Sequence, residues 1–121
     1  MSQRHLRVLV VDDEDDTRDL LSMLLENAGI GCEVASTGGE ALRKAQEEVF
    51  DAILLDLGLP DIDGWEVCRR LKKDPRTSAV RVVVLTGHAM TADRQRAVQA
   101  GCDTILLKPA EVSEILGALN A

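Results

Sequence analysis

Five short apolar runs alternate along the chain with longer segments whose apolar positions recur at helical spacing. No run alternates strictly between apolar and polar positions, which is typical of strands covered on both faces of a parallel sheet. The strands are predicted at Leu6–Val11, Cys32–Ala35, Ala52–Leu57, Val80–Leu85 and Thr104–Leu107. The helices are predicted around Leu20–Leu25, at Gly39–Glu48, around Trp65–Leu71, at Thr91–Ala100 and at Val112–Leu119.

This rhythm of strand and helix predicts right-handed crossovers and a parallel sheet with helices on both faces. Gly29 and Gly101 follow two of the predicted helices, where glycine is favoured, and Pro75 ends a third. Neither a repeat nor a linker interrupts the pattern. We therefore expect residues 1–121 to form one open α/β domain.

The net charge, the apolar runs and the cysteines indicate which partners and which cellular compartment to expect. The 121 residues carry 21 acidic and 14 basic side chains, a net charge of −7, which disfavours direct binding to nucleic acid. The longest apolar stretches have about five residues, far fewer than the ~20 of a membrane-spanning helix, so no membrane insertion is expected. The three cysteines are widely spaced and odd in number, which favours free thiols in a reducing, cytoplasmic compartment.

A polar group follows four of the five apolar runs. These groups are Asp12-Asp13, Asp56, Thr86 and Lys108. Parallel strands end on the same edge of a sheet, and ligands bind at that edge. We therefore expect these residues to converge on one crevice.

The negative charge of three carboxylates in one crevice must be balanced by positive charge or protonation. Two unit charges ~5 Å apart repel by about 3 kcal/mol at an effective dielectric constant of ~20. Lys108 supplies one positive charge, which is too little. Oxygen ligands without His or Cys favour a hard ion, Mg²⁺ or alternatively Mn²⁺. A metal, a carboxylate, a hydroxyl and an amine together are suited to phosphoryl transfer, with Asp56 as the natural acceptor.

These residues, in this order, resemble the receiver domain of two-component response regulators. The resemblance rests on Asp12-Asp13, the segment from Asp56 to Gly64 (DLGLPDIDG), Thr86-Gly87 and Lys108-Pro109, and it covers essentially the whole chain. It implies a (βα)5 flavodoxin-like doubly wound sheet in which the strands follow the order 2-1-3-4-5. It also implies a cis peptide bond between Lys108 and Pro109.

The resemblance also implies residue roles and partners. A histidine kinase or histidine phosphotransfer protein would transfer phosphate to Asp56. Mg²⁺ would be bound by Asp13, Asp56 and the backbone carbonyl of Gly58, with Asp12 helping through water. Thr86 and Lys108 would contact the phosphoryl group. The modified state would be signalled to a downstream protein through the face formed by residues 91–100, 104–107 and 112–119, in a protein that is a monomer or weak dimer.

Two positions differ from residues that many members of this family share, and a third, Gly58, occupies a position that varies within the family. Ile105 stands where many members have a Tyr or Phe that acts as a rotating switch, and Ala110 stands where many have Phe. An aliphatic residue cannot swing an aromatic ring inward, so the usual coupling to Thr86 is not expected here. Gly58, two residues after the acceptor, leaves the site open to water, so we expect no unusually long-lived phosphate.

Two other functions fit parts of the pattern. A metal-dependent phosphohydrolase could use Asp56 as its nucleophile, but Gly58 does not supply the second acid that such enzymes need. An interaction module without phosphorylation would not need the five polar residues at the strand ends. We therefore expect a signalling switch, not an enzyme. The remaining polar segments have simpler interpretations: Asp61-Ile62-Asp63-Gly64 as a turn into a helix, and Lys72-Lys73 as an exposed face.

Overall fold

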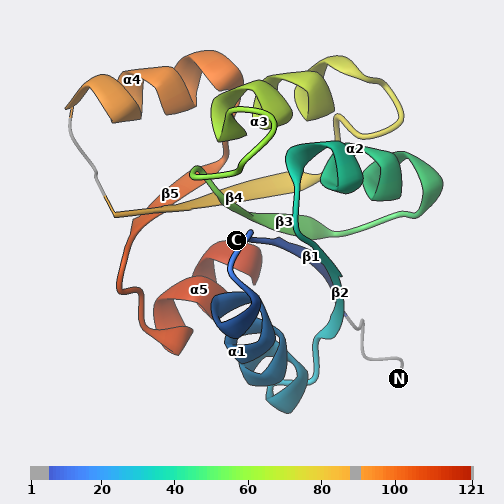
Figure 1. Ribbon diagram of the computed structural model, residues 1–121, viewed down its shortest axis with the longest axis vertical. Helices are drawn as coiled ribbons and strands as arrows, with labels where there is room; N and C mark the ends of the chain where they lie inside the picture. Colours follow the sequence, from blue (N-terminus) through green and yellow to red (C-terminus); the bar gives the residue numbers. More distant parts are fainter. Residues whose placement is uncertain (1–5, 88–90, 121) are drawn as a thin grey trace.

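A parallel sheet with the strand order β2-β1-β3-β4-β5 runs through the centre of the computed structural model (Figure 1). The structure describes residues 6–87 and 91–120, and His88, to which no role was assigned, lies outside them. The strands are β1 (Arg7–Val11), β2 (Gly31–Ala35), β3 (Ala52–Asp56), β4 (Arg81–Thr86) and β5 (Thr104–Leu107). The helices are α1 (Asp15–Asn27), α2 (Gly38–Glu47), α3 (Gly64–Lys73), α4 (Thr91–Ala100) and α5 (Val112–Asn120).

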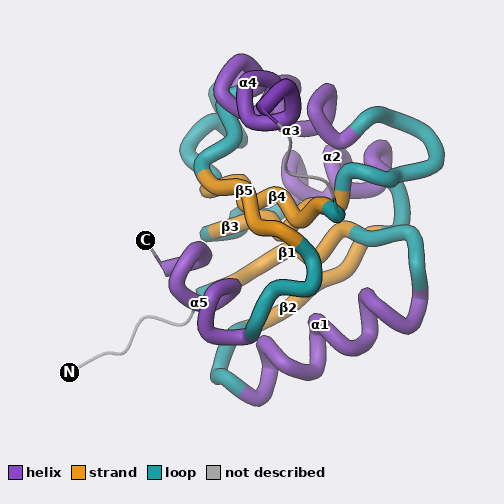
Figure 2. The backbone as a smooth tube through the Cα atoms, turned by 90° about the vertical axis from the view of Figure 1, so that its left-hand side faces the viewer, coloured by secondary structure: helices purple, strands orange, loops and turns teal. Residues whose placement is uncertain are grey.

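The helices form two layers. Helices α1 and α5 cover one face of the sheet, and α2, α3 and α4 cover the other (Figures 1 and 2). This arrangement confirms the predicted (βα)5 flavodoxin-like architecture and its 2-1-3-4-5 order. Within the part of the chain that the structure describes, no helix is long and apolar enough to cross a membrane.

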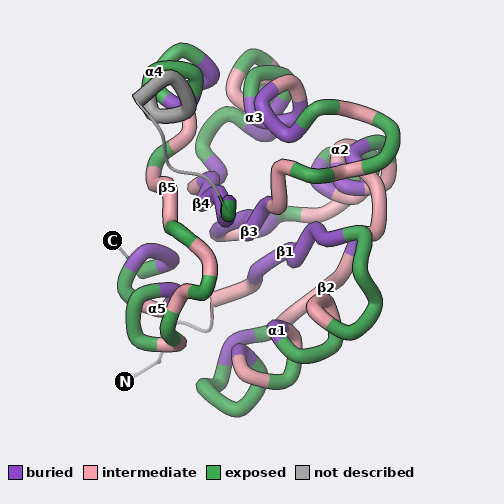
Figure 3. Tube along the Cα trace, turned by 60° about the vertical axis from the view of Figure 1, so that its left-hand side comes forward, coloured by how far each residue is buried: buried purple, intermediate pink, exposed green. Residues whose placement is uncertain are grey.

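Alternate residues of each central strand enter two different cores, which explains the unbroken apolar runs. Val8 and Leu54 pack with α1 and α5 residues, whereas Leu9 and Ile53 pack with residues of α2 and α3. The central strands are accordingly buried along most of their length (Figure 3). A strand covered on both faces needs no polar side, so the sequence shows no alternation.

The helix ends follow the predicted signals. Gly29 and Gly101 both adopt positive φ angles, 84° and 82°; Gly101 directly follows α4, and Gly29 follows α1 after one intervening residue, Ala28. Helix α1 begins at Asp15, so Asp15 and Asp16 lie in its first turn, where acidic side chains complement the helix dipole. The predicted boundaries are correct to within one residue for the strands.

The interpretation of Lys72 as an exposed residue is wrong. Its Nζ donates hydrogen bonds to the backbone oxygen of Val80 at 2.6 Å and to Oδ2 of Asp103 at 2.8 Å. Asp103 in turn accepts a hydrogen bond from the backbone nitrogen of Val82 at 2.8 Å. Lys72 therefore ties α3 to the segments that precede β4 and β5.

Candidate functional site

The register of the sheet brings the polar strand-end residues to one edge. Val11 pairs with Leu55, so Asp12 directly follows a residue that lies beside the end of β3. On the other side of β3, Asp56 pairs with Leu85, the residue before Thr86. Thr86 pairs with Leu107, the residue before Lys108. The predicted convergence on the carboxyl edge of the sheet is therefore confirmed.

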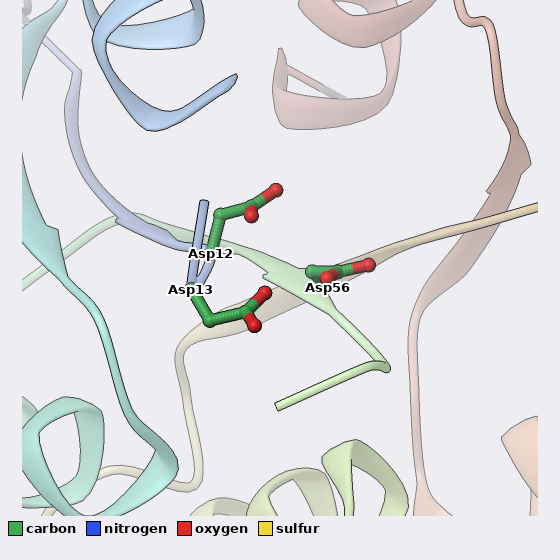
Figure 4. A group of neighbouring side chains, drawn as sticks. All are labelled: Asp12, Asp13 and Asp56. Atoms are coloured by element: carbon green, nitrogen blue, oxygen red, sulfur yellow. The ribbon is translucent and has the colours of Figure 1, made fainter. Parts of the chain in front are cut away.

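Three carboxyl groups meet at this edge (Figure 4). One carboxylate oxygen from each of Asp12, Asp13 and Asp56 lies within 4.8 Å of the other two. The three differ in environment: Asp12 is 2% exposed, the side chain of Asp56 is 14% exposed, and Asp13 is open to solvent. Asp12 is thus the buried member of the cluster, and the cluster is open to solvent at Asp13.

The buried carboxyl of Asp12 is strained electrostatically. Burial raises its pKa above the ordinary value of 3.8, and the neighbouring charges of Asp56 and Asp13 raise it further. A hydrogen bond of 2.9 Å from the backbone N–H of Glu14 and the charge of Lys108 act in the opposite direction. The same like-charge repulsion is relieved when a cation joins the cluster.

Among the residues whose side chains the structure describes, Lys108 forms a salt bridge with this cluster. Its Nζ lies 3.0 Å from Oδ1 of Asp56, and the two form a salt bridge. Its backbone N–H donates a hydrogen bond of 2.7 Å to the carbonyl oxygen of Thr86. The peptide bond between Lys108 and Pro109 is cis, as predicted. The ends of β4 and β5 are thereby joined beside Asp56.

Thr86 is 6% exposed at the last position of β4. In the neighbouring strand, Ile105 is half-buried and packs against the core on the α3 side of the sheet. Ala110 packs against the core on the other side. Aliphatic side chains thus occupy both the position of the aromatic switch, at Ile105, and the position where many members have Phe, at Ala110.

The loop between β3 and α3 (residues 57–63) borders the open side of the cluster. A Cβ atom at the exposed Gly58 would lie 3.6 Å from Oδ2 of Asp56, so the glycine leaves this oxygen uncovered. At the end of the loop, a Cβ at Gly64 would lie 2.8 Å from Cδ2 of Leu57 and 2.9 Å from its Cα. Only glycine permits the loop to fold back so closely on itself.

Two contacts beside the cluster were not predicted from the sequence. Asp61 accepts hydrogen bonds from the backbone N–H groups of Gly38 and Gly39 at 2.8 and 2.9 Å, across 23 and 22 residues. Arg18 donates a hydrogen bond of 2.9 Å to the backbone oxygen of Asp12. For Asp61 the sequence offered one signal, an acidic residue among residues typical of turns. Nothing in the sequence identified Gly38 and Gly39 as its partners. Asp63 was correctly placed in a turn, and it caps α3 by accepting a hydrogen bond of 2.8 Å from Trp65 N.

The donor set fits a hard divalent ion. The residues that meet here offer carboxylate oxygens, with neither sulfur nor imidazole among the three clustered ligands. Mg²⁺ prefers such ligands and keeps several waters, for which the open side at Asp13 leaves room. The single charge of Lys108 does not balance the three clustered carboxylates of the described residues, so a bound cation would offset the excess negative charge.

Comparison with known proteins agrees with this site. The family model for the response regulator receiver domain matches residues 8–120. The DNA-binding dual master transcriptional regulator RpaA of Synechocystis is 37% identical over 115 residues, which cover 95% of this chain and 48% of that protein. The chain spans about half the length of several such relatives.

Solved structures of similar proteins share the fold over nearly the whole chain. The receiver domain of the sensor histidine kinase PA1611 from Pseudomonas aeruginosa has a TM-score of 0.88 at 28% identity, covering 97% of this chain and 96% of that one; its active site cleft holds magnesium. A response regulator protein from Burkholderia pseudomallei, with a phosphorylated aspartic acid and calcium, has a TM-score of 0.87 at 36% identity, covering 94% and 66%.

The match of sequence, strand order and acidic edge leads to one conclusion. The chain belongs to the receiver domain family of response regulators, the phosphate-accepting switches of two-component signalling.

Proposed function

We propose that Asp56 is the phosphoacceptor of this domain and takes its phosphoryl group from a phosphohistidine of a histidine kinase or histidine phosphotransfer protein. The observation that carries this assignment is the position of Asp56, which shares the cluster with Asp12 and Asp13 and pairs with Lys108 at 3.0 Å. In the transfer, a carboxylate oxygen of Asp56 forms the new P–O bond while the P–N bond breaks. The imidazole nitrogen leaves with the electron pair of that bond.

The residues around Asp56 would hold Mg²⁺, with Mn²⁺ as an alternative. Asp13 and Asp56 would supply carboxylate oxygens, Gly58 its backbone carbonyl, and Asp12 would act through water. When bound, the ion supplies positive charge that offsets the carboxylates and the oxygens of the transferring phosphoryl group. Support comes from the donor set and from the magnesium bound in the cleft of the related PA1611 receiver domain.

Lys108 and Thr86 would bind the phosphoryl oxygens. In the unmodified domain Lys108 pairs with Oδ1 of Asp56, so a phosphoryl group on Asp56 would change the partner of the ammonium group. The hydrogen bond between Lys108 N and Thr86 O links this change to both β4 and β5. The α4-β5-α5 face is the proposed surface for a downstream protein, and Val98 and Leu107 are exposed there by 79% and 53%.

The other functional assignments follow from the same proposal. The domain would catalyse only its own phosphorylation and dephosphorylation, because Gly58 offers no acid to protonate a leaving group. Its net charge of −7 makes direct contact with nucleic acid unfavourable, whatever other domains of its relatives do. Residues 1–121 would form a single domain, as a monomer or weak dimer. The three cysteines are free, which supports a cytoplasmic location.

Acetyl phosphate and Mg²⁺ provide the test. Intact-mass spectrometry should show one phosphoryl group on the wild-type domain and none on Asp56→Asn, which keeps the size of the side chain. Asp51→Asn is the matched control, because Asp51 lies before β3, at the opposite end of the strand from Asp56. Phosphorylation of Asp56→Asn to the wild-type level would overturn the proposal. Steady turnover of a phosphate ester by the wild type would favour the hydrolase instead.

A further inference from the structure

Asp61 connects two segments that are distant in the sequence. It lies in the loop between β3 and α3, and its carboxylate accepts one hydrogen bond on each oxygen from the start of α2. Oδ1 lies 2.8 Å from the backbone nitrogen of Gly38, and Oδ2 lies 2.9 Å from that of Gly39. A single side chain thus binds two successive backbone N–H groups of another element.

These two hydrogen bonds provide acceptors for backbone N–H groups at the N-terminus of α2. The first backbone N–H groups of a helix have no partner within the helix. Thr37, the residue before α2, accepts a hydrogen bond from Glu40 N at 3.1 Å and satisfies one of them. Asp61 satisfies those of Gly38 and Gly39. The hydrogen bonds from Gly39 and Gly38 also lower the pKa of Asp61, so its carboxylate stays ionised and favourably placed at the positive end of the helix dipole.

Close packing accompanies the hydrogen bonds. A Cβ atom at Gly38 would lie 2.8 Å from Cγ2 of Val67 and 3.1 Å from Cβ of Ile62, so only glycine fits at this contact. At the start of the loop, Leu57 packs against Gly64, the first residue of α3, where an added Cβ would lie 2.8 Å from Cδ2 of Leu57. The loop is therefore held at Leu57 and at Asp61, and Gly58 lies between these two residues.

We propose that Asp61 is a positioning residue for the metal site, because its bidentate contact with α2 holds the loop that presents the Gly58 carbonyl. This inference rests on the proposed function, in which that carbonyl binds Mg²⁺. Asp61 does not contact the ion; it fixes the backbone that does. Loss of the contact frees the loop, and part of the free energy of metal binding is then spent on ordering it.

Two variants separate this role from ordinary helix capping. Asp61→Ala and Thr37→Ala each remove a cap from the N-terminus of α2, but only the first also releases the loop. Mg²⁺ titrations followed by the fluorescence of Trp65, the single tryptophan and a buried residue at the start of α3, measure the affinity of each variant. Thermal unfolding without metal measures the loss of stability.

We expect Asp61→Ala to weaken Mg²⁺ binding by about tenfold, the effect typical of removing a residue that orients a metal ligand. Thr37→Ala should bind Mg²⁺ within about twofold of the wild type while also losing stability. Equal Mg²⁺ affinities for Asp61→Ala and the wild type would overturn the inference. Absence of Mg²⁺ binding by the wild type would instead overturn the proposed function.

A third variant covers the case in which Asp61→Ala does not fold. Asp61→Asn keeps one oxygen acceptor but loses the second acceptor and the charge, so it should weaken Mg²⁺ binding by less than Asp61→Ala, yet measurably. Amide hydrogen exchange gives an independent readout in metal-free protein. Faster exchange in residues 57–63 of Asp61→Asn than of Thr37→Ala would support the inference, and equal exchange would contradict it.

Discussion

Nζ of Lys108, directly after β5, lies 3.0 Å from Oδ1 of Asp56, at the end of β3. Strand β4 stands between these two strands, so the lysine side chain reaches across the end of β4, where Thr86 is located. Lys108 thus connects the ends of three strands, because its ammonium group pairs with Asp56 and its backbone N–H donates a hydrogen bond to the carbonyl oxygen of Thr86. We therefore expect a modification of Asp56 to change the pairing of Lys108, and through it the start of the segment that leads to α5.

Lys108→Ala should uncouple phosphorylation from its structural consequence. The variant keeps Asp56 and the acidic cluster, so acetyl phosphate should still modify it. Amide chemical shift changes in β5 and α5 on addition of beryllofluoride should largely disappear, because the group that transmits the change is gone. Lys73→Ala, which removes an exposed lysine on α3, is the control and should respond like the wild type. A full response in Lys108→Ala would refute the coupling role.

Asp13→Ala should weaken Mg²⁺ binding yet stabilise the metal-free domain. It removes a proposed ligand, so affinity should fall by more than about tenfold. It also removes one of three negative charges that lie within 4.8 Å of one another. We expect the metal-free melting temperature to rise by roughly 2–5 °C.

Asp19→Ala is the matched control for this prediction. Asp19 is an exposed acid on α1, so the substitution changes the net charge equally without touching the cluster. Calorimetric Mg²⁺ titration and metal-free thermal unfolding should give Asp19→Ala nearly the same Mg²⁺ affinity and melting temperature as the wild type. A lower metal-free melting temperature for Asp13→Ala would contradict the proposed repulsion.

The pKa of Asp12 predicts a pH dependence of stability in the absence of metal. Burial raises this pKa above 3.8, so ionisation of Asp12 favours the unfolded state. The stability that protonated Asp12 contributes is fully present below the ordinary pKa, and it is lost as the pH rises through the raised pKa of the folded state. Asp12→Asn keeps an oxygen for the hydrogen bond from Glu14 N but cannot ionise. The variant should therefore gain stability over the wild type as the pH increases.

Urea unfolding in EDTA over a series of pH values measures this difference. The gain of Asp12→Asn should begin near the ordinary pKa of 3.8 and level off above the raised pKa. Acids far from the cluster are the same in both proteins, so the difference reports on Asp12 and its interactions with Asp13 and Asp56. A gain that stays constant with pH would contradict the prediction. Saturating Mg²⁺ should reduce or reverse it, because the wild-type carboxylate then faces a cation.

The chemistry of the strand ends could be predicted from sequence because two local rules sufficed. Apolar runs place strands, and parallel strands place the residues that follow them on one edge, so Asp12, Asp56 and Lys108 could be brought together before any contact was known. These rules do not predict the order of the strands, because an alternating pattern of strands and helices does not say which strands are neighbours. The strand order followed from the resemblance to receiver domains.

Contacts between loops could not be predicted in the same way. The bond between Asp61 and Gly38 depends on how closely α2 and α3 approach, and hydrophobic spacing carries no information about which loop faces a helix end. The environment of Lys72 is a similar case. Its side chain carbons lie against Gly101 while its Nζ binds Asp103, and both partners come from a segment about 30 residues away.

Gly58 should limit the lifetime of the phosphorylated state. A Cβ at this position would stand 3.6 Å from Oδ2 of Asp56, an ordinary contact, and the backbone φ of Gly58 is not positive. A Cβ is therefore tolerated here, and we expect a larger side chain to shield the acyl phosphate from water. Gly58→Asn should slow dephosphorylation severalfold, measured by the decay of the phosphorylated mass after acetyl phosphate is removed.

Gly117→Asn is the control for this comparison, because Gly117 lies on α5 with no atom within 4 Å of an added Cβ. Its phosphorylated form should decay at the wild-type rate. The wild-type domain itself should lose its phosphate well within hours. A wild-type half-life of many hours would show that the opening at Gly58 does not control access of water.

Gly64 and Gly117 predict opposite effects of the same substitution. Gly64→Ala places a methyl group 2.8–2.9 Å from Leu57, including its backbone Cα, so the loop after β3 must shift. Such overpacking should lower the free energy of unfolding by about 1–3 kcal/mol. Gly117→Ala adds a methyl group in open space on α5 and should raise it by about 0.5 kcal/mol through helix propensity. Urea unfolding of both variants measures the contrast, and a neutral Gly64→Ala would mean that this loop is looser than the packing against Leu57 requires.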